Sequence, residues 1–144
     1  MEIGWRALRA PADRWQIKCP GDAGPDLLAW LGNAQQELFG VLYLDTRNRV
    51  LEREVLYRGT LNTSLARIGE VFRGAIRRNA AAIMVAHNHP SGDPAPSPED
   101  VALTRRLVEA AQLVEVEVLD HLIIGHGRWV SLRERGMGFE SAQH

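Results

Sequence analysis

Two histidines separated by one residue, with an aspartate further along the chain, form the pattern with the clearest chemical potential. His87 and His89 project the same way from an extended segment, so both imidazoles can reach one ion. This spacing alone is a weak signal, and Asp100 strengthens it by offering a third ligand. Three protein ligands with a fourth position left to water are the coordination of a catalytic zinc site. The pattern therefore predicts a mononuclear Zn²⁺ centre.

The residues around this pattern predict a strand before it and a helix after it. Residues 81–86 are wholly apolar and end at His87, which is typical of a central strand covered on both faces. Residues 88–96 are rich in proline and favour a rigid loop. Ser97 is a favoured N-cap with a proline after it, and Asp100 falls in the first turn, near the positive end of the helix dipole.

The remaining periodicities predict a mixed α/β fold in which helices flank a mixed β-sheet. We expect, in chain order, a helix at 26–36, a hairpin of strands at 38–44 and 50–57, a helix at 66–79, the strand at 81–86, a helix at 97–114, and strands at 114–124 and 129–132. We divide the chain into an N-terminal extension at 1–24 with a candidate edge strand at 14–19, one domain at 25–136, and a tail at 137–144 that is expected to fray.

The composition indicates a single globular domain. Of the 144 residues, 45% are hydrophobic and 24% are charged, close to the averages for such domains. A net charge of -1 gives no bulk attraction to nucleic acid, so the charge does not support nucleic-acid binding. No apolar run approaches the roughly 20 residues of a membrane helix, and we expect no membrane partner. The oligomeric state is left open.

The cysteine content and the N-terminus indicate a cytoplasmic location. Cys19 is the only cysteine, so it cannot form an internal disulfide, and this suits a reducing compartment. Residues 1–15 mix charged side chains into their apolar positions and lack the continuous core of a signal peptide. We interpret Cys19 as a small, half-buried apolar residue.

The spacing of the candidate ligands resembles a known family. His87, His89, Ser97 and Asp100 follow the pattern H-x-H-x7-S-x2-D, which matches the JAMM motif of the JAB/MPN metallopeptidases. The string AHNHPSGDP at 86–94 is similar to the RadC branch of that family. The resemblance implies an MPN-type fold, akin to the cytidine deaminase architecture. It also implies a zinc-dependent hydrolase that cleaves a peptide or isopeptide bond in a protein or peptide substrate.

The resemblance assigns chemical roles to two residues beside the ligands. The family places a general base near the start of the first core strand, where Glu37 stands in this sequence. Because zinc lowers the pKa of a bound water to about 7, a carboxylate at hydrogen-bond distance can take its proton. The alternative for Glu37 is a solvated residue at a helix end. The family assigns Ser97 a hydrogen bond to the oxyanion, a duty that we expect to compete with N-capping.

Two features depart from the RadC pattern, although the resemblance covers roughly residues 37–136. RadC proteins resemble two-part chains with an N-terminal helix-hairpin-helix region, and we expect that region to be absent here. Ile68-Gly69-Glu70 stands where the family has Pro-Arg-Glu before a helix. The candidate ligands themselves are intact.

Three further polar residues have simpler interpretations. Asp93 lies between a glycine and a proline, which is typical of a turn rather than of a ligand. His121 follows Asp120 and is either a structural histidine or one that orients a ligand from behind. His126 lies between two glycines and is interpreted as a hairpin-turn residue.

Two rival functions stay open at the level of sequence. One is a DNA-repair or mobile-element accessory protein whose metal centre is structural or supports nucleic-acid binding, an idea that rests on the family's name alone. The other takes His87-Asn88-His89 as an HNH nuclease motif. Such nucleases need a metal-binding histidine or asparagine on the following helix, and residues 97–114 contain neither.

Overall fold

A computed structural model describes residues 15–59 and 68–139 as a mixed α/β fold. Its five-stranded sheet has the strand order β2-β1-β3-β4-β5. The elements are α2 (Pro20–Leu31), β1 (Leu38–Leu44), β2 (Val50–Arg58), α3 (Ile68–Arg77), β3 (Ala82–Asn88), α4 (Pro98–Val114), β4 (Glu117–Ile124) and β5 (Trp129–Ser131).

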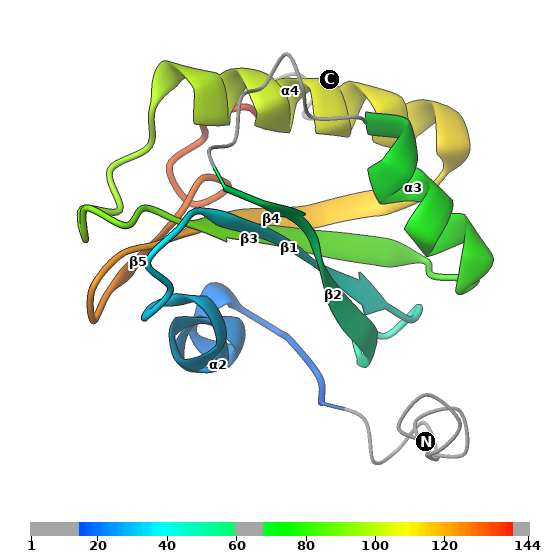
Figure 1. Ribbon diagram of the computed structural model, residues 1–144. Coiled ribbons are helices and arrows are strands. Elements are labelled where there is room, and N and C mark those ends of the chain that lie inside the picture. Colours follow the sequence, from blue (N-terminus) through cyan, green and yellow to red (C-terminus); the bar gives the residue numbers. More distant parts are fainter. Residues whose placement is uncertain (1–14, 60–67, 140–144) are drawn as a thin grey trace.

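The sheet lies between two helical layers. Helix α2 covers one face, and α3 and α4 cover the other (Figure 1). Strand β1 pairs antiparallel with β2 and with β3, β4 pairs parallel with β3, and β5 pairs antiparallel with β4. A parallel pair needs a crossover connection, and α4 supplies it between β3 and β4. Strand β3 is therefore central and buried along its whole length.

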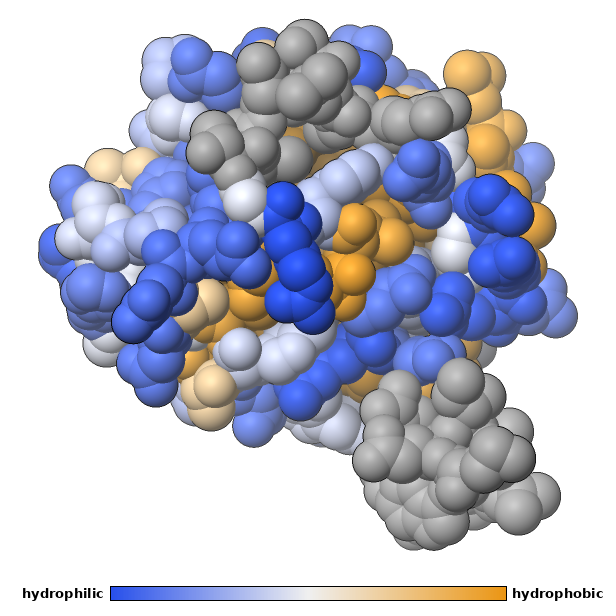
Figure 2. Space-filling view, in the orientation of Figure 1, coloured by the Kyte–Doolittle hydropathy of each residue, from blue (hydrophilic) through white to orange (hydrophobic). Residues whose placement is uncertain are grey.

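Each face of the sheet has its own hydrophobic cluster. One cluster lies under α3 and α4, and the other lies against α2. Packing on the α2 side is close, since a Cβ on Gly24 would overlap the indole of Trp129. Hydrophilic residues predominate on the face seen in Figure 2, with hydrophobic surface in smaller patches. Among the described residues, no helix has both the length and the apolarity to cross a bilayer.

The predicted fold class and element order are confirmed, but the first helix lies earlier than the prediction of 26–36. It runs from Pro20 to Leu31 with Cys19 as an extended N-cap. The segment contains prolines and glycines, but a proline at the first helical position loses only an N–H that has no helical partner. The helix ends at Gly32, whose N–H donates to the Leu28 carbonyl at 2.8 Å.

Three smaller expectations need correction. The candidate edge strand at 14–19 is, in its described part, an isolated bridge between Gln16 and Arg49. Cys19 is exposed rather than half-buried, because it lies at the N-terminal end of α2. The tail does not fray at residues 137–139, since Phe139 is buried in the core cluster under α4, and 140–144 lie outside the described residues.

Candidate metal centre

The sheet topology gathers the candidate site residues at one end of β3. His87 is the penultimate residue of β3, and His89 follows the strand. Because β1 runs antiparallel to β3, with Phe39 opposite His87, the residue just before β1 comes to the same end. That residue is Glu37, and Asp100 reaches the same place from the first turn of α4.

Short distances join these four side chains. Oδ1 of Asp100 lies 2.8 Å from Nε2 of His87, and Oδ2 lies 3.2 Å from Nε2 of His89. Oε1 of Glu37 lies 3.9 Å from Nε2 of His87. One ligand atom from each of Glu37, His87 and His89 falls within 4.8 Å of the others, a grouping that could hold a metal ion.

The unpaired nitrogen of His87 fits a metal site. Nε2 is buried and has no hydrogen-bond partner among the described residues, although the Asp100 carboxylate is near. The two groups are therefore close without the geometry of a hydrogen bond, as ligands that face one ion would be. A buried nitrogen with no partner requires an explanation. Two imidazoles with a carboxylate are a donor set that Zn²⁺ accepts.

The electrostatics keep the Asp100 carboxylate ionised. Burial raises the pKa of Asp100, but its contacts with His87 and His89 and the backbone N–H of Ser97 outweigh burial and hold that pKa well below its usual range. The contact with Asp100 raises the pKa of His89, against the effect of its partial burial. An ionised carboxylate is the form that binds a cation.

A capping box fixes the position of Asp100. The Asp100 N–H donates to Oγ of Ser97 at 3.1 Å, and the Ser97 N–H donates to Oδ2 of Asp100 at 2.8 Å. Ser97 is thus the N-cap of α4, as predicted. The expected competition between capping and oxyanion binding does not hold, because capping uses a lone pair of the hydroxyl and leaves its proton able to donate.

The loop after β3 sets the orientation of His89. Nδ1 of His89 lies 2.9 Å from the Asp93 carbonyl, which can only accept, so Nδ1 carries the proton. In the neutral ring the lone pair is then on Nε2, toward Asp100. The Asp93 side chain accepts from the Ala95 N–H at 3.0 Å, which confirms its interpretation as a turn residue.

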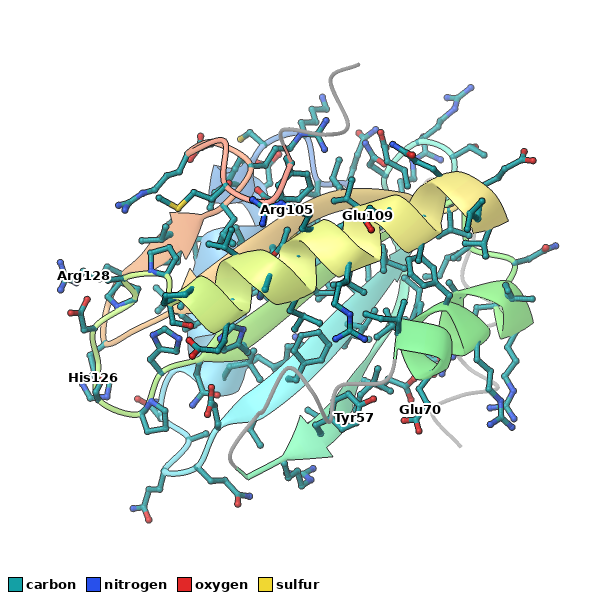
Figure 3. All side chains as sticks on the ribbon, turned by 90° about the horizontal axis from the view of Figure 1, so that it is seen from above. Tyr57, Glu70, Arg105, Glu109, His126 and Arg128 are labelled. Atoms are coloured by element: carbon teal, nitrogen blue, oxygen red, sulfur yellow. The ribbon has the colours of Figure 1, made fainter. Side chains whose placement is uncertain are left out.

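His121 and His126, which were not predicted to be metal ligands, lie in different environments. His126 is exposed in the turn between β4 and β5, at the outer end of the loops beside Arg128, as expected (Figure 3). His121 is fully buried, and its Nε2 lies 2.9 Å from Nδ1 of His87. Burial, and secondly the neighbouring His87, hold the pKa of His121 well below its usual value.

Asn88, between the two histidines, is a residue that sequence reasoning missed. Its Oδ1 accepts from the Leu38 N–H at 2.6 Å, and its Nδ2 donates to the Gln36 carbonyl at 3.1 Å. The side chain therefore holds the backbone on both sides of Glu37. The available signal was a buried asparagine at the end of an otherwise apolar strand.

We expect Asn88→Ala to destabilise the protein by about 1–3 kcal/mol, because the buried Leu38 N–H loses its acceptor. Urea unfolding followed by circular dichroism measures the change. Asn33→Ala, at an exposed position, is the matched control and should lie within about 0.5 kcal/mol of wild type. Equal stabilities of the two variants would show that Asn88 does not hold this segment.

Comparisons with known proteins identify the family. Residues 17–137 match the family model described as RadC-like JAB domain. A UPF0758 protein of Chloroflexus aurantiacus is 52% identical over 141 residues, 97% of this chain and 62% of the relative. A UPF0758 protein of Roseiflexus castenholzii is 51% identical over 140 residues, which is 96% of this chain and 60% of the relative. A UPF0758 protein of Bacillus cereus is 48% identical over 136 residues, which is 94% of this chain and 60% of the relative. The chain thus spans less than two thirds of the length of these relatives. With a domain match over most of its length and relatives at about half identity, the chain belongs to the RadC-like JAB domain family.

Proposed function

We propose that this chain is a zinc-dependent hydrolase that cleaves an amide bond of a protein or peptide. His87, His89 and Asp100 would hold the zinc, with Glu37 as general base and Ser97 as a hydrogen-bond donor to the substrate. The observation that carries the proposal is the convergence of the Nε2 atoms of His87 and His89 on the Asp100 carboxylate, with the buried Nε2 of His87 lacking a hydrogen-bond partner among the described residues.

The distances favour Asp100 over Glu37 as the third ligand. With bonds of 2.0–2.1 Å, two ligand atoms of a tetrahedral zinc site lie about 3.3 Å apart. The Asp100 oxygens, at 2.8 and 3.2 Å from the two Nε2 atoms, are near that value. Oε1 of Glu37 is more distant from His87, at 3.9 Å, which suits a residue that contacts a water beside the ligands.

The roles of the remaining groups follow from their chemistry. Bound zinc would supply Lewis acidity, which lowers the pKa of a water to about 7 and polarises an amide carbonyl. Glu37, as a partly exposed carboxylate, would accept the proton from the attacking water and pass it to the leaving amine. The Ser97 hydroxyl proton would donate to the oxyanion that develops on the carbonyl.

A hollow next to the segment that carries Glu37 is a candidate place for a substrate, although neither Glu37 nor the candidate ligands line it. It has a volume of about 500 Å³, and its lining residues come from the segment around Glu37 and from the end of β2. The lining consists of Ala34, Gln35, Gln36, Leu38 and Arg58. Amide side chains and a guanidinium can form hydrogen bonds with a peptide backbone, so this surface favours an extended polar substrate over an apolar small molecule.

Elemental analysis and amide hydrolysis together test the proposal. Purified protein should hold one zinc per chain, His89→Ala should lose it, and a chelator should abolish cleavage of peptide and isopeptide substrates until zinc is restored. His126→Ala, at the exposed histidine of the β4–β5 turn, is the control that should keep both zinc and activity. Full zinc with no amide cleavage, and with DNA binding that weakens steeply with salt, would favour an accessory protein instead.

A further inference from the structure

A buried chain of hydrogen bonds runs behind His87, on the side away from Asp100. Nδ1 of His87 lies 2.9 Å from Nε2 of His121, and Nδ1 of His121 lies 2.6 Å from the Thr104 hydroxyl. The hydroxyl lies 2.8 Å from the backbone carbonyl of Asp100. His87, His121 and Thr104 have no exposed surface, so water does not compete for these contacts.

The carbonyl at the end of this chain fixes the position of the hydroxyl proton. A carbonyl can only accept, so the Thr104 hydroxyl must donate to the carbonyl of Asp100. With its one proton used, the Thr104 oxygen must accept from His121, and Nδ1 of His121 is therefore the protonated nitrogen.

The same reasoning extends to the metal-facing nitrogen. A neutral His121 that is protonated at Nδ1 offers a lone pair at Nε2, so Nδ1 of His87 must donate to it. With Nδ1 protonated, the ring nitrogen whose lone pair can serve a cation is Nε2, the atom that faces Asp100 and has no hydrogen-bond partner among the described residues.

We propose that Thr104 and His121 are positioning residues that fix the tautomer of His87, so that its Nε2 lone pair faces the metal centre. Metal-ligating histidines commonly donate their other ring N–H to such a partner, which sets the tautomer and the ring orientation. The direction of the hydrogen bond from Nδ1 of His87 to His121 is a property of the metal-free protein, whereas its effect on metal binding rests on the proposed function.

Loss of the Thr104 hydroxyl is expected to reverse the tautomers of His121 and His87. Without the Thr104 hydroxyl, the Nδ1 proton of His121 loses its acceptor inside the core, and an unsatisfied buried donor is costly. The other tautomer of His121 avoids this cost by protonating Nε2, which then donates to Nδ1 of His87. His87 would in turn be protonated at Nε2 and could no longer bind a metal there.

Two measurements on the full chain test the proposal. In ¹⁵N-labelled, metal-free protein, long-range ¹H–¹⁵N correlation should show His87 and His121 protonated at Nδ1. Thr104→Val removes the hydroxyl at similar volume, and we expect loss of that tautomer pattern and a fall in zinc affinity of about 10–100-fold in chelator competition. Thr104→Ser keeps the hydroxyl and should preserve both the tautomers and the zinc affinity.

The outcomes separate this proposal from the proposed function. A His87 ring without a proton at Nδ1 in the wild type would overturn the positioning role, and this result needs no variant to fold. Equal zinc affinities for folded Thr104→Val and Thr104→Ser would overturn it as well. A wild-type protein with the expected tautomers that binds no zinc would refute the hydrolase while supporting the tautomer assignment.

Discussion

Replacement of Glu37 by glutamine is expected to leave zinc bound and to lower amide turnover by about 10²–10⁴-fold, the usual contribution of a general base. An amide has almost the shape of the carboxylate but cannot accept the proton of the attacking water. The Asn88 side chain holds the backbone on both sides of residue 37, so the substituted side chain should stay in place. The loss is therefore expected in turnover rather than in folding.

Parallel measurements of turnover and metal content decide the role of Glu37. Glu99→Gln is the matched control, because it neutralises an exposed carboxylate in the first turn of α4, beside Asp100. This control should retain both activity and zinc. Wild-type turnover by Glu37→Gln would exclude Glu37 as the base, and loss of zinc from Glu37→Gln would make Glu37 a ligand instead.

Local sequence patterns were sufficient for most of the elements. The alternation and apolar runs of β1, β2 and β3 and the Ser-Pro start of α4 are properties of neighbouring residues, and the structure confirms these elements. The predicted start of the first helix, at residue 26, was wrong because α2 begins at Pro20 and continues through Pro25, and packing of its apolar side chains on the sheet stabilises the helix. Phe139 was assigned to a fraying tail because no local periodicity marks it, although it is buried in the core cluster under α4.

The pattern of candidate ligands could be predicted from sequence, whereas the contacts of the residues around them could not. His87, His89 and Asp100 are close in the chain, so their convergence needs only one strand, one loop and one helix. Asn88 contacts the start of β1 through the antiparallel register of β1 and β3, and His121 reaches His87 through the parallel pairing of β4 with β3. No local periodicity encodes these registers.

We expect Asp100→Asn to lower zinc affinity by more than the about 10–100-fold that is typical for loss of a residue behind a ligand. The amide is neutral, so it loses the ionic attraction to the cation while its oxygen can still accept from the Ser97 N–H. The folded state should therefore persist, and chelator competition measures the affinity. Asp93→Asn, in the exposed turn after His89, changes the net charge equally and should bind zinc as wild type does.

Asp100→Asn and Glu37→Gln together decide between the two ligand sets that the geometry offers. Glu37, His87 and His89 form one compact group, and the Asp100 carboxylate lies 2.8 and 3.2 Å from the Nε2 atoms of the two histidines. If Asp100 is the ligand and Glu37 the base, Asp100→Asn loses metal and Glu37→Gln loses only turnover. The reverse result would place Glu37 in the coordination sphere and leave Asp100 as the N3 residue of a capping box. A carboxylate whose neutralisation removes the metal is thus a ligand, and one whose neutralisation removes only the reaction is the base.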